Sequence, residues 1–190
     1  MQFMVDMAMH MMDIAQNSIR AEAKNINIVF IENSEKGTFS FSVNDDGVGM
    51  CDENLRNITD PFFTTRTTRK VGLGIPFLKM SCEQTGGYMR VTSDIGKGTM
   101  VEAVYNSDSP DCLPLGDIAG CLALLVRANK SIRVVFNYRI DEKAFNFDSD
   151  ELRNIGVDLT IPDMTALFKT FLKFELNEVF KYRSTKSMLC

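Results

Sequence analysis

The sequence predicts an α+β protein in which strands joined by short turns alternate with amphipathic helices. Two observations support this expectation. The runs NINIVFI (25–31) and TFSFSV (38–43) place apolar side chains at every second position, as half-buried strands do. Segments near both ends of the chain repeat apolar residues every three or four positions, as helices do. The 190 residues, of which 45% are apolar, suffice to build a hydrophobic core.

The first half of the chain begins with a helix that we expect over residues 5–21. Its apolar stripe consists of Ala8, Met12, Ala15 and Ile19. The two strands follow, joined by the turn ENSEKG. NDDGVGM (44–50) then interrupts the sheet with two glycines, and CDENLRNI forms a short helical turn at most. Helix resumes over about 73–83, and strands at 88–93 and 98–105 close this half around a glycine turn.

The second half begins where the composition shifts to Ser, Asp and Pro, over 107–114. The elements expected beyond it are a helix, a strand pair and an amphipathic helix, over 115–128, 132–140, 143–147 and 163–181. The pattern of the last helix favours packing on the rest of the protein over a free partner surface. We therefore divide the chain into a domain, 1–106, and a small C-terminal α/β appendage, 107–190, which could also pack with the domain as one unit.

Charge and cysteine content exclude several classes of protein. A net charge of −4 provides no basic field to hold nucleic acid. The five cysteines are irregularly spaced and include no CxxC pair, so neither a disulfide framework nor a zinc site is indicated. The Met-rich start lacks the basic region of a signal peptide, and no apolar run is long enough to span a membrane. We therefore expect a cytoplasmic protein with neither a nucleic-acid nor a membrane partner.

Four short motifs carry the candidate chemistry, and each has a plain structural explanation when taken singly. Asp13 and Asn17 lie one helical turn apart and could form part of a solvated face. The D-x-G-x-G motif over 45–49 could be a turn, the G-L-G motif over 72–74 an ordinary loop, and the G-K-G-T motif over 96–99 a hairpin turn. Their order along the chain is what distinguishes them.

In this order the motifs resemble those of the GHKL ATP-binding superfamily, and most closely the catalytic domain of bacterial sensor histidine kinases. The resemblance covers roughly 7–106 and is carried by DDGVGM, DPFFTTR, GLGIPFLK and GGYMRVTSDIGKGTMVEAVY. It implies the Bergerat fold, a two-layer sandwich of a mixed, mostly antiparallel sheet with helices on one face. It also implies that the chain binds ATP or ADP together with Mg²⁺.

The resemblance assigns three groups to adenine. Asp45 matches the position whose carboxylate accepts the exocyclic amine of the base, in a dry pocket where a charged acceptor is effective. Gly47 and Gly49 would let the backbone approach the base closely. Thr99 matches the position that supports the same amine, commonly through a shared water.

At the phosphate end, Asn17 matches the residue that ligates Mg²⁺ through an uncharged amide oxygen. Arg20 would face phosphate, and a basic residue there favours the histidine kinase side of the superfamily over the mismatch-repair side. The base of the expected lid is formed by Gly72, Leu73 and Gly74, where N–H groups at a helix start would cradle phosphate. Residues of the lid that could close over the triphosphate are Thr64, Thr65, Arg66, Arg69 and Lys70, although each of them could equally belong to a solvated loop.

Two departures from the family pattern shape the functional expectation. Asp13 stands where ATP-hydrolysing members have Glu, so the candidate general base has a shorter arm and its competence stays open. His10 is the only histidine, and we interpret it as a structural or surface residue. No helical domain with a phospho-acceptor histidine fits before the first helix, so a stand-alone arrangement is expected.

These features favour an ATP-dependent phosphotransferase or ATPase, acting in regulation or signalling as a protein kinase or a slow ATPase. The alternative is a nucleotide-gated protein-binding module with little or no turnover. The weakest alternative is an adaptor that has lost nucleotide binding. A protein partner or phosphoryl acceptor is expected in either of the first two cases, and the segment 107–190 could pack against the ATP domain, form a homodimer or bind that partner.

Overall fold

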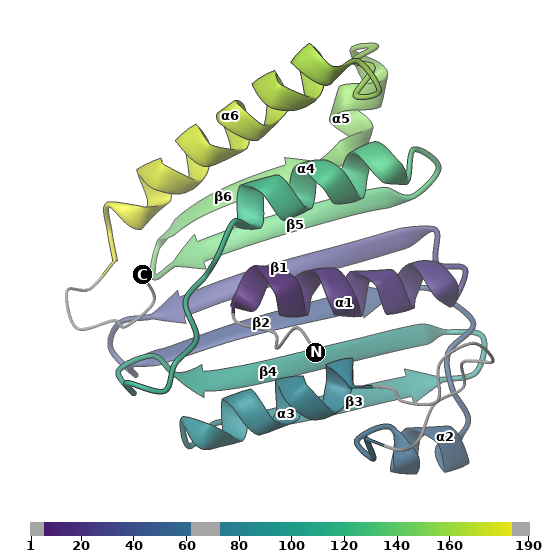
Figure 1. Cartoon of the computed structure of the whole chain (residues 1–190), viewed down its shortest axis with the longest axis vertical. Coiled ribbons are helices and arrows are strands. Elements are labelled where there is room, and N and C mark those ends of the chain that lie inside the picture. The colour runs from purple at the N-terminus through teal and green to yellow at the C-terminus, as the bar shows by residue number, and fades with distance from the viewer. Residues whose placement is uncertain (1–5, 62–72, 184–190) are drawn as a thin grey trace.

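The computed structural model describes residues 6–61 and 73–183 as a sheet covered by helices on one face (Figure 1). The elements are, in chain order, α1 Met7–Arg20, β1 Asn25–Asn33, β2 Thr38–Asp45, α2 Asp52–Asn57, α3 Gly74–Gln84, β3 Tyr88–Asp94, β4 Gly98–Asn106, α4 Ile118–Ala128, β5 Arg133–Ile140, β6 Lys143–Asp148, α5 Ser149–Asn154 and α6 Pro162–Phe180. Among these described residues, no helix combines the length and apolar character needed to cross a membrane.

The sheet has six strands in the order β3-β4-β2-β1-β5-β6. All neighbouring pairs are antiparallel except β1 and β5, which run parallel. The predicted α+β class and the mixed, mostly antiparallel two-layer arrangement of the Bergerat fold are therefore confirmed. Strands β5 and β6, which come from the segment expected as an appendage, extend the sheet of the first half rather than forming a sheet of their own.

An aromatic cluster joins the two halves of the chain under the helices. Phe30 in β1 is fully buried, and its ring centroid lies 5.5 Å from that of Phe41 in β2. On its other side lie Phe136 at 5.7 Å and Tyr138 at 5.5 Å, both from β5. Full burial of each such side chain contributes roughly 1.5–3 kcal/mol. The core therefore spans the boundary that the composition suggests near residue 107.

Helix α1 buries a broader face than the sequence pattern indicates. Its buried residues are Met7, Ala8, His10, Met11, Ile14, Ala15 and Ser18. Met12 and Ile19, expected as members of the buried apolar stripe, are only partly buried, so that expectation is wrong in detail. The physical reason is that α1 packs on the sheet between α3 and α4, which cover its flanks as well (Figure 1).

Two boundaries in the second half differ from the expected ones. Helix α4 begins at Ile118 instead of Leu115, because the carbonyls of Pro114 and Leu115 accept hydrogen bonds from the first residues of α1. Asp117 then caps α4 by accepting the N–H of Gly120 at 3.0 Å. The sequence analysis did not predict the short helix α5, because a helix of six residues has too few apolar positions to show a helical period.

The amphipathic helix α6 packs on the sheet and α4, as expected. The residues that it buries are Phe168, Leu172, Leu176 and Val179. A second apolar stripe stays exposed, with Leu167 62% exposed and Phe174 61% exposed. Packing therefore uses one side of α6 and leaves the other to solvent.

Candidate functional site

Asp45, the last residue of β2, has a buried side chain that hydrogen bonds hold in place at this end of the sheet. It is 7% exposed. Its Oδ1 accepts the backbone N–H of Gly47 at 2.9 Å and that of Thr99 at 3.2 Å. Its Oδ2 accepts the hydroxyl of Ser18 in α1 at 2.5 Å. Three donors from three segments thus fix one buried carboxylate.

The neighbouring Asp46 has a different role. It is exposed and accepts the backbone N–H of Lys24 at 2.7 Å and that of Asn25 at 2.8 Å. Desolvation would raise the pKa of Asp46, but hydrogen bonds from Asn25 and Lys24 outweigh it and hold the pKa below its usual range. Asp46 therefore ties the start of β1 to the end of β2, and only Asp45 is presented as a buried acceptor.

Gly47 and Gly49 are required by close backbone contacts around the loop after β2. A Cβ on Gly47 would lie 2.5 Å from the carbonyl oxygen of Ala21, which follows α1. Gly49 has a φ of +68°, and a Cβ there would lie 1.9 Å from the carbonyl oxygen of Asp94. Only glycine fits both places, so this loop is held tightly between the end of α1 and the β3–β4 hairpin.

Thr99 lies beside Asp45, as its partner in the pairing of β2 with β4. Besides the backbone contact already described, its Oγ1 lies 2.9 Å from the Oγ of Ser93, its cross-strand partner in β3. Ser93 in turn donates to the carbonyl of Gly98 and accepts the N–H of Met50, each at 2.9 Å. The sequence analysis missed Ser93 and Ser18. Ser18 gains Asp45 only through the packing of α1 on the sheet. Ser93 gains Gly98 and Thr99 through pairing across the β3–β4 hairpin, and Met50 from a loop more distant in the chain.

At the other end of the candidate site, Arg20 holds Asn17. Its Nη1 donates to Oδ1 of Asn17 at 2.8 Å, and its Nη2 donates to Oε1 of Gln16 at 3.2 Å. Amide and carboxylate oxygens suit Mg²⁺, so the donor set fits this ion once Arg20 releases Asn17. Over residues 6–61 and 73–183, no group of three or more His, Cys, Asp or Glu is placed to hold a metal.

Helix α3 brings the base of the expected lid against Asp13. A Cβ on Gly74 would lie 1.6 Å from Oδ2 of Asp13, so the first residue of α3 packs directly on the carboxylate. Leu73 precedes the helix as its N-cap residue. The remaining predicted lid and lid-base residues lie outside the described residues, and they are Thr64, Thr65, Arg66, Arg69, Lys70 and Gly72.

His10 lies deeper in the same region, as a buried residue of α1. It is 1% exposed, and its Nε2 lies 3.5 Å from Oγ of Ser81 in α3. Burial lowers the pKa of His10 to about 4, so the imidazole is neutral near pH 7. These features agree with a structural role rather than that of a phospho-acceptor.

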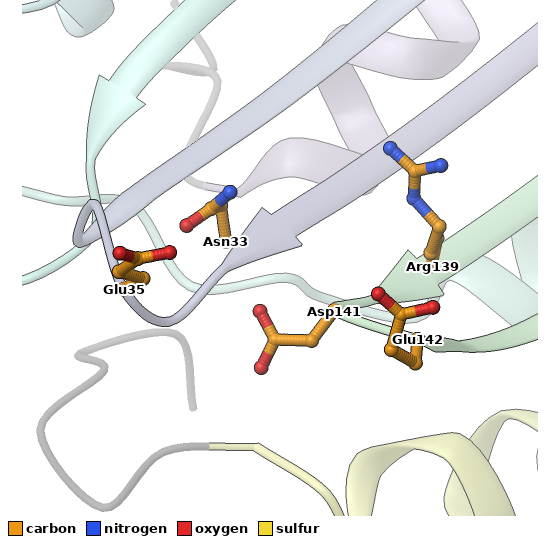
Figure 2. A pocket seen from close by; sticks show the side chains of 5 residues that line it. All are labelled: Asn33, Glu35, Arg139, Asp141 and Glu142. Atoms are coloured by element: carbon orange, nitrogen blue, oxygen red, sulfur yellow. The ribbon is translucent and has the colours of Figure 1, made fainter.

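Two cavities are lined by other residues, except that Gln16, which accepts from Arg20, borders the second. One, of about 630 Å³, is lined by Asn33, Glu35, Arg139, Asp141 and Glu142 (Figure 2). It sits at the Asn33 end of β1, whereas Asp45 pairs with Ile26 at the opposite end. A second, of about 360 Å³, lies between α1 and α4 and is mostly apolar, with Met12 and Leu124 in its wall. Neither contains a residue that the sequence analysis assigned to the nucleotide.

Comparison with known proteins connects this geometry to a family. The family model described as histidine kinase-, DNA gyrase B-, and HSP90-like ATPase matches residues 7–108, more than half of the chain. A solved structure titled as the N-terminal domain of a DNA repair protein shares the fold with a TM-score of 0.54 and 16% identity, over 76% of this chain and 52% of that one.

Curated relatives match the same region. Sporulation kinase C of Bacillus subtilis (strain 168) is 32% identical over 100 residues, which is 51% of this chain and 23% of that protein. Sensor histidine kinase ZraS of Escherichia coli (strain K12) is 32% identical over 90 residues, 47% of this chain and 19% of that protein. The chain thus matches less than a quarter of the length of each. On the match of the family model to more than half of its length, the chain belongs to the family of histidine kinase-, DNA gyrase B- and HSP90-like ATPases, with an ATP-binding domain of the histidine kinase type.

Proposed function

We propose that this chain binds Mg·ATP where α1, the loop after β2 and the β3–β4 hairpin meet, and that it acts in signalling or regulation as a protein kinase or a slow ATPase. The observation that carries the proposal is the buried carboxylate of Asp45, which three hydrogen bonds orient at the end of β2. Such an acceptor suits the exocyclic amine of adenine, and a hydrogen bond to a charged group contributes roughly 1.5–3 kcal/mol. Thr99 stands beside it to support the same amine.

The phosphates would lie along α1 toward α3. Asn17 would hold Mg²⁺, which when bound neutralises phosphate charge. Arg20 would exchange its present contacts with Asn17 and Gln16 for phosphate oxygens, since a guanidinium binds phosphate in a fork. The lid base around Gly74 and the lid residues named from the sequence would enclose the triphosphate.

Asp13 is the proposed general base. Its contact with Gly74 puts the carboxylate between α1 and the first turn of α3, beside the proposed lid base. From there it would take a proton from the attacking water or acceptor hydroxyl. Its arm is one methylene shorter than that of Glu, and this predicts slow turnover because misplacement by about 1 Å lowers rates roughly a hundredfold.

The test is incubation of the full chain with γ-labelled ATP and Mg²⁺, combined with calorimetric titration of ADP. Wild type should release labelled phosphate or label a protein. Asp13→Ala should keep ADP binding and lose turnover, and Asn17→Ala should lose the Mg²⁺ dependence of binding. Asp45→Asn should lower ADP affinity about a hundredfold, since the amide presents a donor where an acceptor is needed.

Asp46→Asn is the matched control, because Asp46 neighbours Asp45 but bonds only to the start of β1. It should retain the ADP affinity of the wild type. Absence of any ADP binding by the wild-type chain, or an equal loss in both aspartate variants, would contradict the proposed site.

A second candidate is a nucleotide-gated binding module with little turnover. The observation that favours it is the exposed apolar stripe of α6, in which Leu167 and Phe174 stay open to solvent among the described residues; this stripe would serve a protein partner or a second copy. In this case ATP would bind with the same dependence on Asp45 but would not be cleaved. Turnover that disappears in Asp13→Ala would decide for the enzyme.

The names of the matched relatives, a sporulation kinase and a sensor histidine kinase, support signalling as the setting. By this analogy the partner would be a protein that accepts the phosphoryl group or is released by nucleotide binding. A cytoplasmic location and a homodimer belong to the same proposal. Labelling of a candidate acceptor protein by the wild-type chain would test the kinase form of it directly.

A further inference from the structure

Ser18 is a buried polar residue that contacts Asp45 but has so far been given no role of its own in selecting a ligand. It follows Asn17 in α1 and is 1% exposed. Its Oγ lies 2.5 Å from Oδ2 of Asp45 and 3.4 Å from the carbonyl oxygen of Ile14. A hydroxyl has a single hydrogen, and a carboxylate at 2.5 Å is the stronger acceptor. Ser18 therefore donates to Asp45 across the interface between α1 and the sheet.

The hydrogen bonds of Asp45 leave a defined acceptor position. Each carboxylate oxygen offers about two lone-pair directions. Oδ1 uses both, for the N–H groups of Gly47 and Thr99. Oδ2 uses one for Ser18. One direction on Oδ2 is left for a ligand, and the hydroxyl of Ser18 determines which one it is.

We propose that Ser18 is a positioning residue that sets the preference of this site for a 6-aminopurine over a 6-oxopurine; this inference rests on the proposed role of Asp45 in binding adenine. Ser18 holds the carboxylate so that the remaining lone pair of Oδ2 meets the exocyclic amine. Because its only hydrogen is committed to Asp45, Ser18 has none to offer a 6-oxo group. Such a group would therefore meet an acceptor without a compensating donor.

Ser18 also connects the two ends of the proposed site. Asn17 and Ser18 are consecutive residues of α1, so a shift of this helix moves the metal ligand and the partner of Asp45 together. The position of the base and the position of the phosphates are thereby fixed on one rigid element. This coupling explains why a buried hydroxyl is useful at this place on the helix.

The experiment is calorimetric titration of the full chain with ADP, with GDP and with purine riboside 5′-diphosphate, which lacks the 6-amino group. Ser18→Ala should lower ADP affinity about tenfold and leave the affinity for purine riboside diphosphate unchanged. The ratio of ADP to GDP affinity should fall with it. Ser18→Thr, which keeps the hydroxyl, should restore most of the ADP affinity. Ser18→Cys, close in size but a weak donor, provides the same test if Ser18→Ala fails to fold.

Ser81→Ala is the control for loss of a buried serine hydroxyl, because Ser81 bonds to Leu78 and Tyr105 away from the site. It should leave the affinities for all three nucleotides as in the wild type. Equal losses of ADP and purine riboside diphosphate affinity in Ser18→Ala would overturn the inference and leave only a structural role for the hydroxyl.

Asp45→Asn separates this inference from the proposed function. If Asp45→Asn removes the preference for ADP over purine riboside diphosphate while Ser18→Ala leaves it intact, only the role of Ser18 is wrong. If Asp45→Asn changes neither affinity, the proposed adenine site itself is wrong.

Discussion

The two halves of the chain share one sheet but differ in what they contribute to it. Every sequence-assigned site residue that the structure describes belongs to α1, β2, α3, β4 or the loops beside them, all before residue 107. The second half supplies Phe136 and Tyr138 to the core and the exposed stripe of α6 to the surface. Stability is thus distributed over the whole sheet, whereas the candidate chemistry is confined to the ends of a few elements.

The buried carboxylates of Glu32 and Asp45 show the same difference between a stabilising role and a role in binding. Glu32 in β1 accepts from Tyr138 at 2.5 Å, and Arg183 donates to both of its oxygens, at 2.6 and 2.9 Å. Its charge is matched by a cation and its acceptor capacity is used within the protein. Among the described residues, Asp45 instead has only neutral donors and one remaining acceptor position. The difference indicates that Glu32 binds Arg183 and so holds the segment after α6 on the sheet, while Asp45 is available to a ligand.

The largest expected effect comes from removing the second half. Residues 1–106 alone should not unfold cooperatively, because β1 would become an edge strand and Phe30 would lose Phe136 and Tyr138. Urea unfolding followed by circular dichroism measures this against the full chain. A cooperative transition that matches that of the full chain would establish 1–106 as an independent domain. It would contradict the view that both halves of the chain stabilise the sheet.

The next effect comes from breaking the ion pair of the second half. Arg183→Ala should lower the free energy of unfolding by about 3–5 kcal/mol, because Glu32 would be left charged and buried without its cation. Affinity for ADP, measured at a temperature where the variant is folded, should not change. A loss of ADP affinity with unchanged stability would show that the ion pair between Glu32 and Arg183 supports the nucleotide site.

A third effect concerns pH and the first half. Because burial lowers the pKa of His10 to about 4 from 6.5, the unfolded chain binds a proton in this window that the folded chain does not. Stability should therefore be fully present above pH 6.5 and fall by up to about 3 kcal/mol as the pH drops to 4. Urea midpoints at pH 7 and 4.5 should differ less in His10→Gln than in the wild type. Equal differences in the two proteins would contradict a buried neutral imidazole.

The smallest effect on stability should come from the surface of α6. Phe174→Ser should change the free energy of unfolding by no more than about 0.5 kcal/mol, since the side chain is 61% exposed. Sedimentation would test whether the exposed stripe of α6 joins two copies of the chain. A shift from dimer to monomer in Phe174→Ser would identify the stripe as that contact. A large destabilisation would mean that the stripe belongs to the core of the second half.

The order and type of the long elements could be predicted because they depend on local periodicity. The alternation around Ile28 and Phe41 and the helical spacing near both ends are visible within windows of a few residues. Boundaries were less predictable: α4 starts late because the carbonyls of Pro114 and Leu115 bond to α1, a contact more than a hundred residues away in the chain. The buried face of α1 was misjudged for the same reason, since α3 and α4 cover its flanks.

The sequence by itself determined the class of fold, the family resemblance and the presence of Asp45, Gly47 and Gly49 in one motif, because each of these is encoded by short spacing. Only the tertiary structure decided that β5 lies parallel to β1, that Asp45 rather than Asp46 is the buried acceptor, and that Ser18 orients it. These features arise from hydrogen bonds and packing between segments far apart in the chain. Adjacent residues of the same type can therefore acquire different chemistry.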